Sequence, residues 1–204
     1  MPRRIRFGGA CLCSEGMGQS LHMAEKNSYT VPGLTSEVGA RVAAILQDRL
    51  NAYNDLHLTL KHIHWNVVGP NFISVHEMLD PQVEAVRGFA DDVAERIATL
   101  GSSAKGTPGT IVSERSWDDY SIGRATAIEH LGALDLVYTG VIETTRKNIE
   151  EVGEIDPVTE DMLIGQSAQL ELFHWFVRAH LENSGGQLST ANAGSEVEAA
   201  QQAG

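Results

Sequence analysis

Four long segments of this chain carry apolar residues at steps of three and four, the spacing that lines up side chains on one face of an α-helix. In the first segment the pattern begins after Ser36, which can cap a helix, and ends near Gly69 and Pro70, which stop one. Its apolar positions are Val38, Val42, Ile45, Leu46, Leu50, Tyr53, Leu56, Leu60 and Ile63. Long amphipathic helices bury their apolar faces by packing side by side, so the pattern predicts an all-α fold.

Three further segments repeat this spacing. The second covers about residues 72–100 and contains Pro81, where we expect a kink. The third covers about residues 122–152. The fourth follows Asp156, a candidate helix cap with a proline after it, and ends at the Ser-Gly-Gly of residues 184–186.

The link between the second and third segments, residues 101–121, is long enough to cross the length of a bundle. The stretch SWDDYS at residues 116–121 offers a short capped turn of helix inside it. Four long helices with one long crossover have ferritin-like connectivity. We therefore predict a ferritin-like four-helix bundle over residues 31–186, with a short helix in the crossover between helices 2 and 3.

Two flexible arms are expected to flank this bundle. Residues 1–30 contain glycine and serine without an apolar period, and Met17 or Met23 are alternative starts of the chain. Residues 187–204 form the second expected arm, which carries no lysine or arginine.

Charge and composition exclude several classes of protein. The net charge of -12 attracts cations and repels nucleic acid unless a basic tail compensates. No run of 18 apolar residues is present, so we expect no membrane-spanning helix. The opening residues fall short of a secretory signal, and Cys11 and Cys13 are too few for a disulfide framework. A cytoplasmic protein fits best.

Residues 64–80, HWNVVGPNFISVHEMLD, spread two histidines and an acid around a Gly-Pro turn. A metal centre inside one ferritin-like bundle needs a Glu-x-x-His on each of two helices. The chain has one such match, from Glu171 to His174, so we do not expect an internal two-metal centre.

The second helix carries ligand-type residues in a stripe instead. On a helical wheel His76, Asp80, Asp91 and Glu95 fall at about 0°, 40°, 60° and 100°. Asp80 and Asp91 lie about 16 Å apart along the axis, so one chain cannot bring all four to one ion. If the helix packs antiparallel against its copy across a two-fold axis, the first pair of one chain meets the second pair of the other, giving two equivalent sites.

His64, close to the end of the first helix, is a candidate for a further ligand beside His76. Mixed imidazole and carboxylate ligands suit iron(II), and also zinc, manganese or cobalt. The alternative is an ordinary solvated face on which these acids form surface salt bridges.

The stretch KHIHWNVVGPNFISVHEMLDPQVEAVRGFADDVAERI, residues 61–97, resembles the signature of Dps, the DNA-binding protein from starved cells, a family of ferritin-like proteins. The resemblance covers about residues 35–185 and includes SWDDY and FHWFVRAHLE. It implies a hollow dodecamer that oxidises Fe2+, preferably with hydrogen peroxide, at a two-iron site on each two-fold interface. The resemblance also implies that the ferric mineral is stored in the cavity and that DNA is thereby protected from oxidative damage.

By motif position, the resemblance assigns His64, His76 and Asp80 to one subunit of the site. It assigns Asp91 and Glu95 to the two-fold mate, in agreement with the helical wheel.

Two neighbours complete the implied site. Trp65 would sit near the iron and take or relay an electron, with a buried interface aromatic as the alternative. Lys61 would bind a water or the mate's carboxylate, with a surface lysine as the alternative. Trp175 is interpreted as a core residue. The remaining histidines considered are interpreted as core or surface residues: His57, His62, His174 and His180.

The family also implies acidic pores near the start of the fourth helix. Asp156 and Asp161 are the candidates, with Glu160 behind them, and rings of carboxylates would concentrate Fe2+. The alternative is helix capping by Asp156 and an acidic first turn that favours the helix dipole.

Two other functions are also compatible with the sequence. A nucleoid-compacting DNA-binding protein would bind phosphate through the three arginines of PRRIRF in the N-terminal arm. Many copies would add avidity, but the acidic chain does not favour this reading. A buffer for a metal other than iron would use the same ligands.

Overall fold

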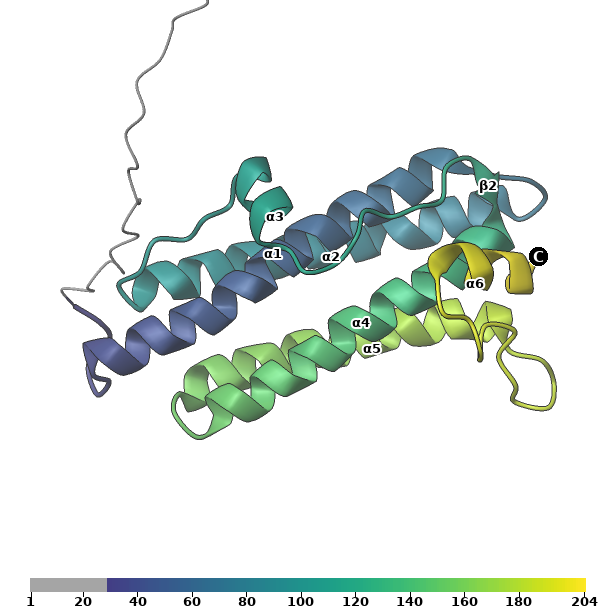
Figure 1. Cartoon of the computed structure of the whole chain (residues 1–204). Helices are drawn as coiled ribbons and strands as arrows, with labels where there is room; N and C mark the ends of the chain where they lie inside the picture. Colours follow the sequence, from purple (N-terminus) through teal and green to yellow (C-terminus); the bar gives the residue numbers. More distant parts are fainter. Residues whose placement is uncertain (1–28) are drawn as a thin grey trace, which may run out of the picture.

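In the computed structural model, residues 29–204 are described, and they form four long helices in a bundle (Figure 1). The long helices are α1 (Ser36–Asn66), α2 (Phe72–Thr99), α4 (Ala127–Gly153) and α5 (Pro157–Leu181). Two short helices are α3 (Pro108–Glu114) and α6 (Glu196–Ala203), and two short parallel strands are β1 (Val67–Val68) and β2 (Ala125–Thr126). The predicted all-α, ferritin-like bundle is confirmed. No helix within residues 29–204 is long and apolar enough to cross a bilayer.

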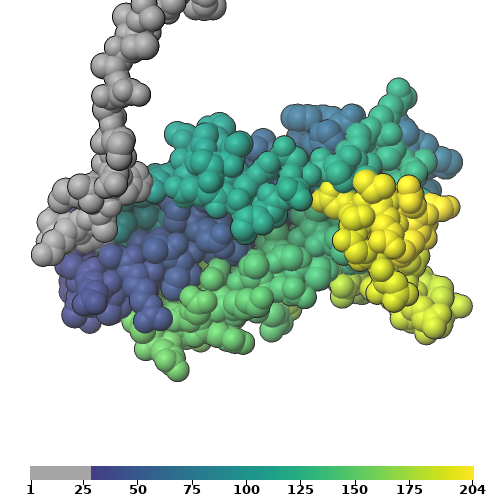
Figure 2. Space-filling view, in the orientation of Figure 1, coloured from purple at the N-terminus to yellow at the C-terminus, as the bar shows by residue number. Residues whose placement is uncertain are grey.

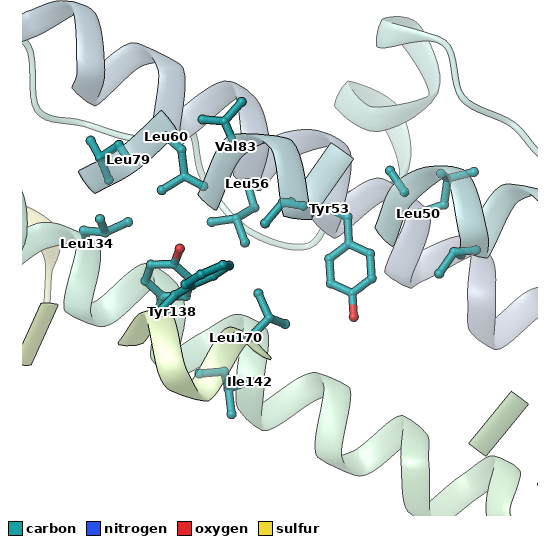
Figure 3. Packing of buried hydrophobic residues seen from close by; sticks show 14 of the residues in the cluster. Leu50, Tyr53, Leu56, Leu60, Leu79, Val83, Leu134, Tyr138, Ile142 and Leu170 are labelled. Atoms are coloured by element: carbon teal, nitrogen blue, oxygen red, sulfur yellow. The ribbon is translucent and has the colours of Figure 1, made fainter. Parts of the chain in front are cut away.

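The helices pack as two antiparallel pairs, α1 with α2 and α4 with α5. The apolar face predicted for the first helix points into the space between these pairs (Figure 3). Fully burying one such aliphatic side chain contributes roughly 1.5–3 kcal/mol, so this shared core dominates the stability. Polar side chains also lie among these residues; for example, the Tyr138 hydroxyl donates to Oε1 of Gln82 at 2.6 Å.

Helix starts differ from the sequence prediction at two places. The cap of α1 is Thr35, one residue before Ser36, and its side chain accepts from the Val38 amide. The helix expected from about residue 122 begins at Ala127, because Thr126 and Glu129 form a reciprocal capping box there. Helix α2 runs through Pro81 without interruption.

The crossover contains a short helix, as predicted, but this helix is α3. Residues 116–121, where the prediction placed it, are not helical. The indole of Trp117 donates to Asp55 of α1 at 2.9 Å, and Arg115 bonds the same carboxylate at 3.1 Å. These long-range contacts hold residues 116–121 in a non-helical path along α1 and help enclose a cavity of about 660 Å3 between α1, the crossover and α4.

The C-terminal segment differs from the expected flexible arm. Its last residues form α6, which lies on the surface of the bundle (Figure 2) and packs on α4. Ala199 and Ala200 are buried there. Ser195 caps this helix, and Glu196 accepts bonds from both the backbone and the hydroxyl of Ser121 in the crossover. The other expected arm, residues 1–30, lies outside the described residues except for Tyr29 and Thr30.

The close approach of α6 depends on Gly132 of α4. A Cβ built there would lie 2.5 Å from the Ala199 carbonyl oxygen and 2.8 Å from the Ala203 Cβ. We expect Gly132→Ala to detach α6, seen as faster hydrogen exchange at residues 196–203. Gly140→Ala on the same helix is the matched control, since its Cβ would meet nothing within 4 Å. It should leave α6 protected and stabilise α4 by up to about 1 kcal/mol. Equal exchange at α6 in both variants would contradict this role for Gly132.

Candidate functional site

A tight turn brings the two predicted histidine positions together at one end of the α1–α2 pair. Gly69 has φ +96, a left-handed conformation that favours glycine. Its carbonyl accepts from the Phe72 amide at 3.1 Å, and α2 starts there. The chain therefore reverses within a few residues, and the last turn of α1 lies beside the first turns of α2.

His64 and His76 lie against each other at this end. Their rings stack with centroids 3.6 Å apart and an interplanar angle of 20°. Nδ1 of His64 lies 2.9 Å from the His76 carbonyl oxygen, and Nδ1 of His76 lies 2.9 Å from the His64 carbonyl oxygen. The Phe72 ring also lies beside His76, with ring centroids 5.0 Å apart.

These reciprocal bonds fix the tautomer of both rings. A carbonyl oxygen only accepts, so each Nδ1 must carry the proton and donate it. In a neutral imidazole the lone pair then belongs to Nε2, the atom available to a metal ion. A histidine whose second nitrogen donates to a backbone carbonyl is the usual arrangement of a metal ligand. The two imidazoles are therefore each in the tautomer that can offer one Nε2 ligand to a metal ion such as Fe2+.

Asp80 adds a carboxylate one helical turn beyond His76. Its Oδ1 accepts from Nζ of Lys61 at 3.1 Å and lies 3.4 Å from Nδ1 of His64. The hydrogen bond from Lys61 lowers the pKa of Asp80, with smaller contributions from the nearby histidines. Asp80 is therefore ionised at neutral pH, and 54% of its side chain is exposed to a partner or ligand.

Lys61 and Trp65 lie on the same side of α1 as this site. The Lys61 ammonium is 5.9 Å from the centroid of the Trp65 ring, a cation–π distance. Within one chain Lys61 binds Asp80 of its own subunit. The Trp65 side chain is 70% exposed, so an aromatic surface is available beside the histidines.

Asp91 and Glu95 lie further along α2 and are exposed. Asp91 lines a shallow pocket of about 320 Å3 with residues of α1 and the crossover, among them Asn54 and His57. Within residues 29–204 no group of three His, Cys, Asp or Glu side chains in one chain is placed to hold a metal ion. The single subunit thus presents His64, His76 and Asp80 at one place and Asp91 and Glu95 at another.

The two pore candidates differ in their surroundings. Asp156 is buried and bonds Arg96 of α2 at 2.7 Å and the Thr159 hydroxyl. Burial raises its pKa, but the bonds from Thr159 and Arg96 outweigh this and lower it. Asp156 therefore joins α2 to the start of α5 within the subunit, and its role in a pore stays a prediction. Asp161 is exposed on the first turns of α5, where a pore role stays a prediction.

A buried cluster in the other helix pair was missed by the sequence analysis. Asp135 of α4 accepts from Nε2 of His174 at 2.6 Å, Nε of Arg178 at 2.9 Å and the Thr190 hydroxyl at 2.8 Å. An acid on the apolar face of the third helix, four residues after Leu131, was the signal available for it.

The single Glu-x-x-His match has other partners. Glu171 pairs with Arg146 and accepts from Ser167, while His174 is held by Asp135. Trp175, predicted to be a core residue, is 60% exposed. It lines a pocket of about 400 Å3 together with residues of α4 and α5, among them Ile142 and Arg178.

Comparisons with known proteins agree with this architecture. A family model described as a ferritin-like domain matches residues 43–184. The DNA protection during starvation protein of Mycolicibacterium smegmatis is 62% identical over 176 residues, covering 86% of this chain and 96% of that protein. The fine tangled pili major subunit of Haemophilus ducreyi is 49% identical over 186 residues, covering 91% and 98%. The structure of DpsA14 from Streptomyces coelicolor has a TM-score of 0.79 at 67% identity, covering 80% and 97%.

Proposed function

This chain belongs to the Dps family of ferritin-like proteins, and from that premise we propose that it oxidises Fe2+ with hydrogen peroxide at sites shared by two subunits and stores the ferric product. The relatives at 62% and 49% identity have names that suggest different functions, so the proposal rests on the site residues. The observation that carries it is the pair of reciprocal Nδ1–carbonyl bonds, which leave Nε2 of both His64 and His76 free beside an ionised Asp80.

Each residue has a distinct task in this reaction. His64 and His76 bind Fe2+ through neutral Nε2 atoms that the backbone carbonyls keep oriented. Asp80 supplies negative charge, and Lys61 holds this carboxylate in place. Asp91 and Glu95 of the two-fold mate complete the ligand set. Trp65, exposed beside the site, is placed to donate or relay one electron.

The redox step balances when two Fe2+ ions react together. Each ion gives up one electron, and hydrogen peroxide accepts both, takes up two protons and leaves as two waters. Pairing the transfers avoids a one-electron cleavage of peroxide that would release a hydroxyl radical. The iron supplies the redox chemistry, while the protein fixes the positions of the reactants and their access.

The product and the assembly follow from the same proposal. A hollow dodecamer would collect ferric mineral inside, and exposed acids such as Asp161 would concentrate Fe2+ at its pores. We place the protein in the cytoplasm, where it would protect DNA by consuming both reactants of radical chemistry.

The test is anaerobic loading of the protein with Fe2+, followed by hydrogen peroxide and, separately, by oxygen. We expect fast formation of ferric iron with peroxide and no nicking of plasmid DNA added to the same reaction. Ferric iron formed no faster than in protein-free buffer, or nicking as in that buffer, would contradict the proposal. Loading with Zn2+ or Mn2+ in parallel separates an iron oxidase from a buffer for another metal.

Direct DNA binding is a separate prediction, and its residues lie outside the described part of the chain. The three arginines of the N-terminal arm would carry it. A gel shift at low salt, with and without residues 1–28, decides whether the arm binds DNA.

A further inference from the structure

Two charged residues on α2 lie on the same stripe as the candidate iron ligands, and the proposed reaction gives them no role. Glu84 and Arg87 fall at about 80° and 20° on the wheel that places the ligands between about 0° and 100°. Arg87 Nη1 bonds Glu84 Oε1 at 3.0 Å, and their side chains are 59% and 71% exposed. An exposed pair of this kind adds little to the stability of a single helix.

The positions of these residues along α2 share one centre with the ligands. When a helix packs antiparallel on its copy, residues equally far from the two-fold axis lie opposite each other. His76 with Glu95, and Asp80 with Asp91, are both centred between Ala85 and Val86. Glu84 and Arg87 are centred at the same point. The register that completes the iron site therefore also sets Glu84 of one chain opposite Arg87 of the other.

Resting on the proposed function, we propose that Glu84 and Arg87 form a self-complementary ion-pair clasp with a second copy of this chain, which sets the register of the two iron sites. At the axis each arginine then lies between the glutamate of its own helix and that of the partner. Four alternating charges enclosed between two helices interact more strongly than one exposed pair, because water is partly removed from them.

The clasp offsets a repulsion between carboxylates at the same interface. In this register Asp80 lies opposite Asp91, and Glu95 lies opposite His76. The two aspartates repel each other until a cation lies between them, while the Lys61–Asp80 bond offsets only part of that charge. The clasp is the attractive charged contact at the centre of the stripe. It therefore holds two metal-free subunits in the register that Fe2+ requires.

Charge reversal tests the clasp directly. Arg87→Glu would gather four negative charges at the axis, and Glu84→Arg four positive ones. We expect each to raise the protein concentration at which two-fold-linked subunits dissociate by about 100-fold, measured by native mass spectrometry over a dilution series. The double variant E84R/R87E restores alternation and should return to within about 10-fold of the unchanged chain. Arg146→Glu reverses another exposed, glutamate-paired arginine away from α2 and should have no effect.

A second measurement tests the register by disulfide formation and does not depend on reversing the charges. Glu84→Cys and Arg87→Cys chains, each with Cys11→Ser and Cys13→Ser, are co-expressed and oxidised. Opposite positions form the disulfide, so the mixed dimer should exceed both self-linked dimers. Circular dichroism of every variant checks that the helices are retained.

The outcomes separate this inference from the proposed function. Single reversals that leave association unchanged, a double variant that fails to recover, or self-linked dimers in excess would each overturn the clasp, even with full peroxide-driven oxidation in the unchanged protein. Conversely, weakened single variants and a restored double variant support the clasp even if the unchanged protein oxidises no iron, and then the proposed function alone fails.

Discussion

Peroxide-driven Fe2+ oxidation is expected to fall by at least about 100-fold when His76 and Asp80 are both replaced by alanine. The variant removes one imidazole and one carboxylate from the face that the unchanged chain presents to iron. His64 remains, but its Nδ1 keeps only a backbone partner and its Nε2 cannot hold the ion alone. The fold should survive, because neither side chain belongs to the apolar core and alanine favours helix. Stopped-flow absorbance of ferric iron measures the rate.

Asp92→Ala is the matched control for this variant. It removes a carboxylate from the same helix, next to Asp91 but at about 160° on the wheel and so off the ligand stripe. Its oxidation rate should match that of the unchanged protein. A double variant that oxidises iron as fast as Asp92→Ala would show that His76 and Asp80 are not the ligands.

Two variants that are each inactive alone should also regain iron oxidation when they form mixed dimers. In a mixed dimer of H76A/D80A with D91A/E95A, one site combines the intact halves of the two chains and the other site lacks both halves. Random mixing makes about half of the dimers mixed, so about a quarter of the unchanged activity should return. A site contained within one chain would return none. The experiment therefore tests the shared site and not only the identity of its ligands.

The long helices were predictable because their burial repeats within each helix. The apolar positions of the first helix follow a helical period that depends on no distant residue. In the structure they are core or partly buried residues. The C-terminal helix has no such signal. It buries mainly Ala199 and Ala200. Its close packing on α4 depends on the absence of a side chain at Gly132, which is far away in the sequence.

The path of the crossover shows the same limit. SWDDYS suits a capped turn locally, yet Trp117 and Arg115 bond Asp55 on α1, and these contacts override local propensity. Asp156 likewise suits a helix start, but its partner Arg96 comes from the end of another helix. In each case the deciding contact joins residues that only the folded chain brings together.

Part of the candidate site was predictable because its residues are close together in the sequence. His64, His76 and Asp80 are linked by one short turn, so their proximity follows from the sequence. The reciprocal hydrogen bonds between each Nδ1 and the other histidine's carbonyl oxygen do not follow from the sequence, since they depend on how closely α1 and α2 pack. The contribution of Asp91 and Glu95 from a second subunit stays a prediction that the mixing experiment tests.

Asp135→Ala is expected to lower the free energy of unfolding by about 3 kcal/mol, the largest stability effect we predict for one side chain. The carboxylate is 7% exposed and accepts from His174, Arg178 and Thr190, so its loss leaves three donors without their acceptor. Thr190→Val removes one of these donors and should cost about 1 kcal/mol. Chemical denaturation at matched protein concentration measures both, since assembly adds to stability.

The same cluster predicts how stability depends on pH. Burial acts to raise the pKa of Asp135, but hydrogen bonds from His174, Arg178 and Thr190 together outweigh it and lower the pKa from 3.8 to about 2. A carboxyl with a lowered pKa in the folded state stabilises the fold above its unfolded value and loses that contribution as pH falls through the folded value. Between pH 4 and pH 2 the unchanged chain should therefore lose about 2 kcal/mol that Asp135→Ala does not lose. Parallel acid curves for the two chains would show that this carboxylate is not the group responsible.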